Sequence, residues 1–325
     1  RILRWTDECK RSHDACNHPL PGQQINSLLP KRPMDVGLTG QSHLRLVILN
    51  NIPGEYLALS YCWGKTHAGM ITTDDNLGQM QVGVELALFS QTIKYAVKVA
   101  RALHVQYLWV DALCIIQRQP GSEDWKEESQ KMSQIYGNAY LTIAASSASD
   151  SAEVSFVEPM GPLRDSSTGQ RKIYFKEQID MREAFAEDVE KGFLLRRASV
   201  KQERILSPRI IDFSGRQIYW SCRTCRYSEA GENNADGARE AANLMHSMRL
   251  WGIIRLLHGK QRDTMEGFFF RAWGNLIGEY SVLGLTYESD RLAAMQGIAA
   301  VLSEVIGCRY FAGLWENNLA DGLMW

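Results

Sequence analysis

Strand-like and helix-like segments alternate through the first half of this sequence, and that alternation limits the folds open to the chain. Two apolar runs, Tyr56–Tyr61 and Tyr107–Ile116, predict buried strands, the second of them buried on both faces. Apolar residues at helical spacing predict helices at Gln91–His104 and Glu123–Asn138. A third strand is predicted at Tyr140–Ala145.

The resulting order is that of two right-handed βαβ units, which place three parallel strands in one sheet. Ligands of such sheets bind outside the carboxyl ends of the strands. This rule nominates the segments that end the first two strands, Ser60–Gly64 and Asp111–Gln117, as the ligand-binding edge.

The second half of the chain has a different pattern. Arg209–Phe213 and Gln217–Cys222 predict a β-hairpin, and helices are predicted at Gly237–His258 and Ser289–Ile306. We therefore predict an α/β fold with a parallel sheet core, extended by a hairpin and a largely helical C-terminal half. Its parts are residues 1–50, with an N-terminal helix and a lead-in strand, residues 51–150, with the βαβαβ core, and residues 151–325, packed as one domain with that core.

Composition and charge exclude several classes of protein. With 325 residues, 45% of them hydrophobic and 22% charged, the chain has ordinary globular usage, and a net charge of −1 gives nothing that would attract nucleic acid or an anionic membrane. No apolar run reaches the ~18 residues of a membrane span, and Arg1–Lys10 lacks the apolar centre of a signal peptide. Seven cysteines, an odd number, suit reduced thiols. We expect a cytoplasmic protein with no nucleic-acid and no membrane partner.

One carboxylate falls on an apolar helix face. On a helical wheel Glu128 shares a face with Trp125 and Ile135, whereas Glu127 points away and is expected in solvent. Burial is costly for a carboxylate and raises its pKa, and such groups are enriched at functional sites. A position at the edge of the face, with the carboxylate in solvent or beside an arginine, is equally compatible with the pattern.

Asp111 is a second carboxylate set among apolar residues. Bonding of loop amides at the strand end and ligand binding are both open for it. Ser60 has neither a nucleophile-elbow motif nor an assignable histidine partner, so a hydrolase triad has little support. No glycine-rich phosphate loop of standard spacing is present.

A basic cluster surrounds Glu203. Because its members alternate with this carboxylate and with apolar residues, we expect a solvated helix face with internal ion pairs rather than a phosphate site. The members are Arg196, Arg197, Lys201, Arg204 and Arg209.

Cys9, His13 and Cys16 suggest a zinc site, but a regular helix argues against it. Such a helix would place Cys9 and Cys16 about 10.5 Å apart along its axis, too far for one ion with sulfur bonds of ~2.3 Å. Cys222 and Cys225 have ligand-like spacing without a second pair visible in the sequence. A single pair such as Cys9 and His13 could still bind an ion together with ligands from elsewhere in the chain. We nevertheless expect a packed helix with buried thiols and no metal site.

Three motifs resemble those of the heterokaryon-incompatibility (HET) domain of fungal cell-death proteins. They are Tyr56–Gly64, Tyr107–Gln117 and the stretch Asp124–Ala145. Flanking segments are similar as well, so the resemblance extends from about Trp5 through Trp325. Four positions around the motifs depart from the family pattern. Ser90 stands in place of Pro, Tyr95 in place of Asp, Arg118 in place of an acidic residue and Ser199 in place of Trp.

The resemblance implies fungal non-self recognition, a form of innate immunity that ends in programmed cell death. It also implies a core similar to the TIR domain, a flavodoxin-like sheet with helices on both faces. Many TIR domains hydrolyse NAD with a glutamate that follows a helical tryptophan by four residues, and here Glu128 follows Trp125 by three. Glu128 is therefore the candidate catalytic residue, and NAD is the expected substrate rather than a permanently bound cofactor. The candidate nucleotide-binding residues are Ser60, Tyr61, Trp63, Gly64, Asp111 and Gln117.

The same resemblance leaves open a module without enzymatic activity. Such a module would signal cell death by self-association, with sensor domains of other HET-system proteins as partners, and Glu128 would then be structural. An inactive relative that retains only the fold is a third reading.

Overall fold

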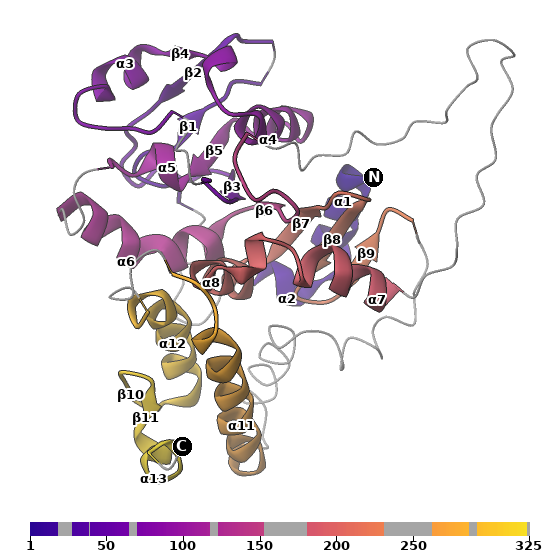
Figure 1. Cartoon of the computed structure of the whole chain (residues 1–325), viewed down its shortest axis with the longest axis vertical. Helices are drawn as coiled ribbons and strands as arrows, with labels where there is room; N and C mark the ends of the chain where they lie inside the picture. Colours follow the sequence, from indigo (N-terminus) through magenta and orange to yellow (C-terminus); the bar gives the residue numbers. More distant parts are fainter. Residues whose placement is uncertain are drawn as a thin grey trace, which may run out of the picture.

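The computed structural model describes residues 1–18, 28–38, 40–64, 70–117, 123–152, 181–230, 262–285 and 291–323. Within these ranges a sheet of nine strands forms the centre of the molecule, in the order β4-β2-β1-β5-β3-β6-β7-β8-β9 (Figure 1). Helices in the same ranges are all too short or too polar to cross a membrane.

Four parallel strands occupy the middle of this sheet. In spatial order they are β5 (Tyr107–Val110), β3 (Tyr56–Ser60), β6 (Leu141–Ala145) and β7 (Arg209–Phe213). Every residue of β3, β6 and β7 is buried, as expected for strands that are covered on both faces. The three predicted strands are confirmed as parallel, and β7 adds a fourth.

The direction of winding reverses beside β3. The chain runs from β3 outward to β5, returns past β3 to β6 and continues to β7, which is the order of a flavodoxin-like doubly wound sheet. The connecting helices are the two predicted ones, α4 (Gln91–Ala102) and α6 (Glu123–Asn138). Because crossovers between parallel strands are right-handed, opposite directions of travel place α4 and α6 on opposite faces, as Figure 1 shows. The topological switch point therefore lies between β3 and β6.

Antiparallel strands extend both ends of the parallel group. On one side β1 (Met34–Asp35) pairs with β5 and with β2 (His43–Leu46), and β2 pairs with β4 (Val84–Glu85). On the other side β8 (Ile218–Cys222) pairs with β7, and β9 (Arg226–Ser228) pairs with β8. The predicted hairpin is confirmed.

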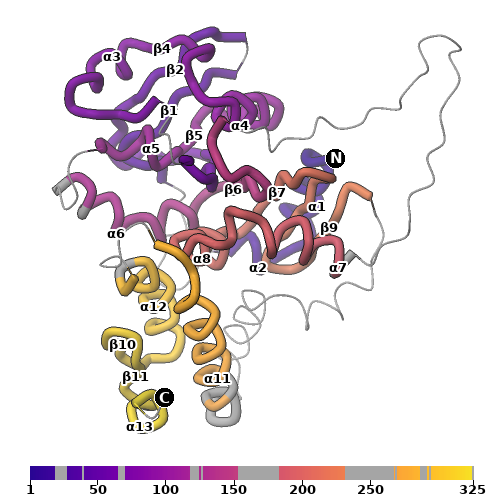
Figure 2. The backbone as a smooth tube through the Cα atoms, viewed as in Figure 1, coloured from indigo at the N-terminus to yellow at the C-terminus, as the bar shows by residue number. Residues whose placement is uncertain are grey.

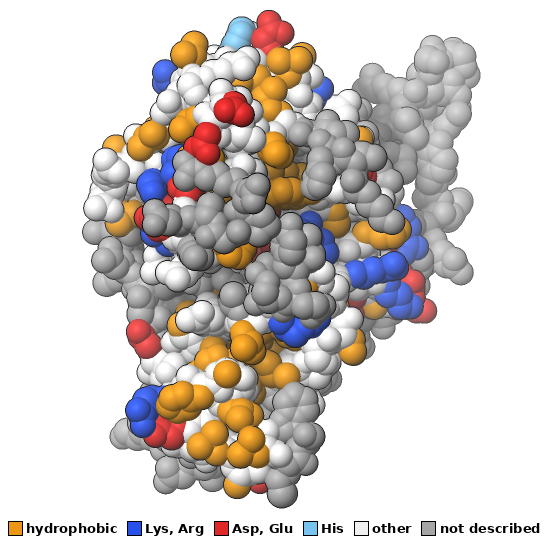
Figure 3. All heavy atoms as spheres, turned by 60° about the vertical axis from the view of Figure 1, so that its left-hand side comes forward, with side chains coloured by type: hydrophobic (Ala, Val, Ile, Leu, Met, Phe, Trp, Pro, Cys, Tyr) orange, Lys and Arg blue, Asp and Glu red, His pale blue; other side chains and the backbone are white. Residues whose placement is uncertain are grey.

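A second apolar core joins the sheet region to the C-terminal helices. It lies between α8 (Ala198–Leu206), α11 (Arg262–Ser281) and α12 (Ala293–Ile306), and is built around buried aromatic rings such as Trp273. Figure 2 shows α11 and α12 in one lobe next to α6 and α8. Apolar side chains gather on the surface of this lobe (Figure 3), and the exposed ones include Leu292, Phe311 and Leu319.

The helix predicted at Gly237–His258 lies outside the described residues, and the one at Ser289–Ile306 is present as α12. The remaining elements are mostly short. They are α1 (Ile2–Ser12), α2 (Asp14–Asn17), α3 (Leu77–Val82), η1 (Leu86–Leu88), α5 (Asp111–Cys114), α7 (Met181–Phe185), η2 (Ala186–Glu190), η3 (Leu194–Arg196), β10 (Tyr310–Phe311), β11 (Leu314–Trp315), η6 (Glu316–Asn318) and α13 (Leu319–Gly322).

The strand predicted at Tyr107–Ile116 is too long. It ends at Val110, and the following residues turn into α5. The Asp111 carboxylate accepts a hydrogen bond from the Ala112 amide at 2.8 Å, and the Asp111 carbonyl accepts one from the Ile115 amide at 3.1 Å. An aspartate at the first turn of a helix satisfies amides that would otherwise lack partners, and here that local bonding outweighs the apolar pattern.

The basic cluster around Glu203 is also not the solvated face that the sequence predicts. Arg204 donates two hydrogen bonds to the Asp212 carboxylate of β7, at 2.6 and 3.0 Å, and both side chains are buried. Ser146 donates a third hydrogen bond to the same carboxylate at 2.7 Å. Arg209 is buried as well, whereas Arg196 is exposed. Burial of these charges requires such paired geometry, because an isolated ion would lose its hydration without compensation.

Breaking the buried pair should be strongly destabilising. We expect Arg204→Met to lower the free energy of unfolding by about 3–5 kcal/mol, because it leaves the Asp212 charge buried without its partner. The double variant Arg204→Met/Asp212→Leu should be less destabilised than the single variant. Chemical denaturation of each protein measures both effects.

The matched control is the exposed pair Arg309 and Glu316. Arg309→Met removes the same chemical groups at the surface and should leave stability nearly unchanged. An Arg204→Met variant as stable as Arg309→Met would contradict a buried, mutually dependent pair.

Candidate functional site

The carboxyl ends of β3 and β5 bring Trp63 and Asp111 together, as the sequence predicts for the two nominated segments. The Trp63 indole Nε1 lies 3.0 Å from each oxygen of the Asp111 carboxylate and donates to it. Asp111 keeps part of its surface exposed. Desolvation by the surrounding protein raises the pKa of the Asp111 carboxyl. Arg197 and the hydrogen bonds from Trp63 and Ala112 partly offset that rise.

Arg197 approaches the same place from the start of α8. Its guanidinium donates to the carbonyl of Tyr61 at 3.0 Å. Burial opposes a charge at this position, but the carboxylates of Asp111 and Glu203 outweigh it and raise the pKa of Arg197. This half-buried cation is therefore bonded to a strand-end carbonyl and stabilised by the charges of two carboxylates.

Glu203 of α8 is the second carboxylate of the group. Its side chain is buried, and burial raises the pKa of Glu203 to about 7. The negative charge of Asp111 adds to this rise, while Ser60, Arg197 and Tyr136 reduce it. A carboxyl with a pKa near neutrality can give and take a proton under physiological conditions.

Ser60 completes the group at the end of β3. Its hydroxyl is buried and makes no well-formed hydrogen bond to any residue that the structure describes. We refer to Ser60, Trp63, Asp111, Arg197 and Glu203 as the carboxyl-edge cluster. It lies beside the switch point between β3 and β6, where doubly wound sheets bind their ligands.

Arg197 and Glu203 were not predicted as site residues. Glu203 lies three residues from both Val200 and Leu206, which are buried residues of the same helix, so the wheel argument applied to Glu128 applies to it equally. The five basic residues of the cluster around Glu203 gave the segment the appearance of a solvated face. Nothing in the local pattern indicates that Arg197 reaches the ends of β3 and β5.

Three further residues predicted to bind the nucleotide, Tyr61, Gly64 and Gln117, contribute to the packing and the loops around the cluster. Tyr61 is buried, and burial raises the pKa of its phenol well above the usual value. Gly64 has a φ of +89°, and a Cβ there would lie 1.9 Å from an Asp150 carboxylate oxygen, so only glycine fits. The Gln117 amide donates to the carbonyls of Asp111 and Ile115, at 3.1 and 3.0 Å, and thereby holds the loop after α5.

Glu128 is buried, as its place on the apolar helix face predicts, with only 1% of its surface exposed. Burial raises the pKa of its carboxyl, and Arg32, Lys131 and Lys31 partly offset that rise. Its Oε1 atom lies 3.6 Å from Lys131 Nζ and accepts no hydrogen bond from the described residues. Glu127 is exposed and paired with Lys31 and Lys131, as predicted.

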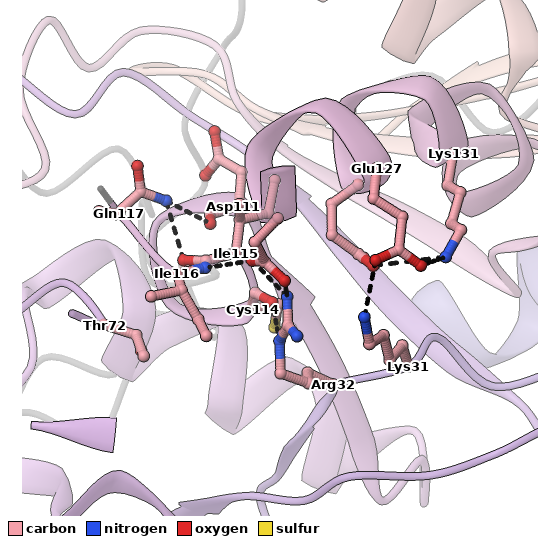
Figure 4. A network of polar contacts seen from close by, with 12 residues as sticks. Lys31, Arg32, Thr72, Asp111, Cys114, Ile115, Ile116, Gln117, Glu127 and Lys131 are labelled. Atoms are coloured by element: carbon pink, nitrogen blue, oxygen red, sulfur yellow. Dashed lines mark hydrogen bonds and ion pairs between the residues drawn. The ribbon is translucent and has the colours of Figure 1, made fainter. Parts of the chain in front are cut away.

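The basic groups around Glu128 belong to a network that is separate from Arg197. Arg32 donates to both oxygens of Asp124 at 2.7 and 2.6 Å, and to the Cys114 carbonyl at 3.1 Å. This pair ties the start of α6 to α5. Figure 4 shows Glu127 between Lys31 and Lys131 at one end of the network, and Gln117 with Asp111 at the other. The two buried carboxyls, Glu128 and Glu203, thus respond to different cations.

A comparison with protein families matches residues 56–203 to the family described as Heterokaryon incompatibility protein (HET). The matched span begins with β3 and ends on Glu203, so it includes every member of the carboxyl-edge cluster. No curated protein and no solved structure gave a significant match to the chain. Residues 56–203 of the chain thus form a heterokaryon-incompatibility (HET) domain.

Proposed function

We propose that this HET domain cleaves the bond between nicotinamide and ribose in NAD, and that this cleavage is its contribution to programmed cell death after non-self recognition. The observation that carries the proposal is Asp111, a partly exposed carboxylate at the carboxyl end of β5 with a second carboxyl, Glu203, behind it. The strand order β5-β3-β6-β7 supports a TIR-like core with its ligand at the switch point.

The chemistry needs carboxylates at this position. As the bond from C1′ to the nicotinamide nitrogen breaks, its electron pair leaves with nicotinamide and positive charge develops on the ribose ring. A fixed carboxylate stabilises that charge in a site where water is scarce. Water then attacks C1′ and releases a proton, and the products are nicotinamide, ADP-ribose and that proton.

Each member of the cluster has a role in this scheme. Asp111, oriented by the Trp63 indole, faces the ribose and stabilises the developing charge. Glu203, with a pKa of about 7, takes the proton from water. Arg197 attracts the diphosphate of the nucleotide and keeps the two carboxyls from repelling one another.

Glu128 is the residue that the family resemblance nominates for catalysis. In this structure its carboxyl is buried beside Arg32 and Lys131, so contact with NAD would require α6 to shift. The geometry therefore favours Asp111 and Glu203 as the reacting carboxyls. Substitution of each residue separately distinguishes the two assignments.

Nicotinamide release from NAD tests the proposal. We expect the purified chain to release nicotinamide, and we expect Asp111→Asn to reduce the rate at least about 100-fold, because it removes the charge that faces the ribose. Glu127→Gln is the matched control, since Glu127 is exposed and paired with Lys31 and Lys131, and it should leave the rate unchanged. Samples clustered on a surface should be assayed beside dilute ones.

The same assay has two contrary outcomes. Loss of activity in Glu128→Gln alone would move the catalytic role from Asp111 to Glu128. An absence of nicotinamide release from dilute and clustered protein alike, with assembly detected by light scattering, would favour the non-enzymatic module that signals by self-association.

The raised pKa of Glu203 predicts a dependence of stability on pH. Below pH 4.5 the folded and unfolded chains both bind the proton, and above pH 7 neither does, so the dependence lies between these values. In that interval only the folded chain holds the proton, so stability falls as pH rises, by about 3 kcal/mol in total. Denaturation of the wild type minus that of Glu203→Gln isolates this contribution. A difference that stays flat from pH 4 to about 8, the range spanning both pKa values, would contradict the raised pKa.

A further inference from the structure

Three thiols and an imidazole meet at the opposite edge of the sheet from the carboxyl-edge cluster. Cys222 ends β8 and pairs with Arg209, the first residue of β7, so it lies at the amino edge of the parallel strands. Cys9 of α1, Cys16 of α2 and His13 between these helices approach it from the N-terminal segment. The group thus joins parts of the chain that are more than 200 residues apart in sequence.

The spacing of the four side chains fits a tetrahedral metal centre. One ligand atom from each of Cys9, His13, Cys16 and Cys222 lies within 4.8 Å of all the others. The Cys222 sulfur is 3.4 Å from His13 Nδ1. In a tetrahedral zinc centre with sulfur bonds of ~2.3 Å, neighbouring sulfurs are about 3.8 Å apart, so only small side-chain adjustments are needed.

A break between α1 and α2 makes this convergence possible. The single regular helix that the sequence suggested for Cys9 to Cys16, and that argued against zinc, is therefore wrong. α1 ends at Ser12, and α2 begins at Asp14. His13 has φ −114° and ψ 82°, which is not helical, and the Cys16 amide donates back to the His13 carbonyl at 2.9 Å. The chain folds back at His13, so Cys16 returns toward Cys9 instead of lying about two turns further along the helix axis.

The surroundings of the sulfurs suit thiolates. The amides of Thr224 and Cys225 both donate to the Cys222 sulfur at 3.4 Å. The buried Arg209 guanidinium lies 3.3 Å from the Cys9 sulfur through Nε. Three thiolates and a neutral imidazole around a divalent ion carry a net charge of −1, and a buried arginine compensates for it.

We propose that Cys9, His13, Cys16 and Cys222 bind one structural Zn²⁺ ion. Thiolate and imidazole ligands in tetrahedral geometry select zinc over the harder cations that prefer oxygen. The protein fills all four positions, so the site has no opening for a substrate. The ion fastens the N-terminal helices to the β8–β9 hairpin, and its binding energy becomes part of the stability of the fold.

Cys225 is a neighbour of this centre rather than a ligand. Its sulfur lies 3.6 Å from the Cys222 sulfur and 3.9 Å from His13 Nδ1. The set whose atoms all lie within 4.8 Å of one another contains Cys16 and not Cys225. Variants of these two cysteines therefore distinguish the ligand sets.

Metal content of the full chain tests the site directly. Protein purified under reducing conditions from zinc-supplied cells should contain one zinc per chain by mass spectrometry of the metal. Replacement by Co²⁺ should give the visible absorption of tetrahedral cobalt together with thiolate-to-cobalt charge transfer. Wild-type protein that holds far less than one zinc and develops no such spectrum would overturn the proposal.

Single variants assign the ligands. Cys222→Ser and Cys16→Ser should lose most of the zinc, whereas Cys225→Ser and Cys308→Ser, the latter a buried cysteine of the C-terminal lobe, should retain it. Retention in Cys16→Ser combined with loss in Cys225→Ser would overturn the assigned set. Should Cys222→Ser fail to fold, the cobalt spectrum of the wild type still decides between a metal centre and a group of buried thiols.

Discussion

Parallel pairing on both sides of β3 is the constraint on which the rest of this structure depends. Parallel strands all point the same way, so the residues that follow β3 and β5 must meet at one edge. That edge collects Trp63 and Asp111 although 48 residues separate them in the chain. The reversal of winding between β3 and β6 then leaves this edge uncovered by a crossing connection, which is why ligands of doubly wound sheets bind there.

α8 adds charged side chains to both the packing against the sheet and the candidate site. Two successive residues of this helix, Glu203 and Arg204, are both buried, and the cost of burying their charge is avoided in different ways. Arg204 keeps its charge by pairing with Asp212 of β7, whereas Glu203 has a pKa near neutrality and can bury its neutral form. One short helix therefore anchors the C-terminal lobe to the sheet and contributes an acid to the candidate site. The two roles share the same packing, so changes in the lobe can reach the site through α8.

The opposite edge of the sheet has a different chemistry. There the N-terminal helices pack Trp5 against Trp220 and Tyr227, and the thiols and imidazole converge beside them. Two short helices bury little apolar surface to offset the entropy that is lost when they dock on the sheet. A metal centre adds attachment at the point where the hairpin turns, far from the carboxyl ends where chemistry is proposed.

The sequence by itself determined the order of strands and helices in the core, the parallel direction of its strands and the place of Glu128 on an apolar helix face, because each depends on periodic patterns within one segment. It also determined that Asp111 and Trp63 lie at one edge, since the βαβ rule fixes where strand ends meet. The end of β5 at Val110 was missed because one aspartate bonding its own loop amides outweighs an apolar run.

Only the tertiary structure decided which distant side chains share a charge environment. Arg197 and Glu203 belong with Asp111, and Glu128 with Arg32, because separate segments fold against the same strand ends. The kink at His13 was likewise beyond the sequence, since a single non-helical residue decides whether Cys16 meets Cys9. Local patterns fix the faces of helices and strands, whereas the partners of a buried charge or thiol are set by packing between segments.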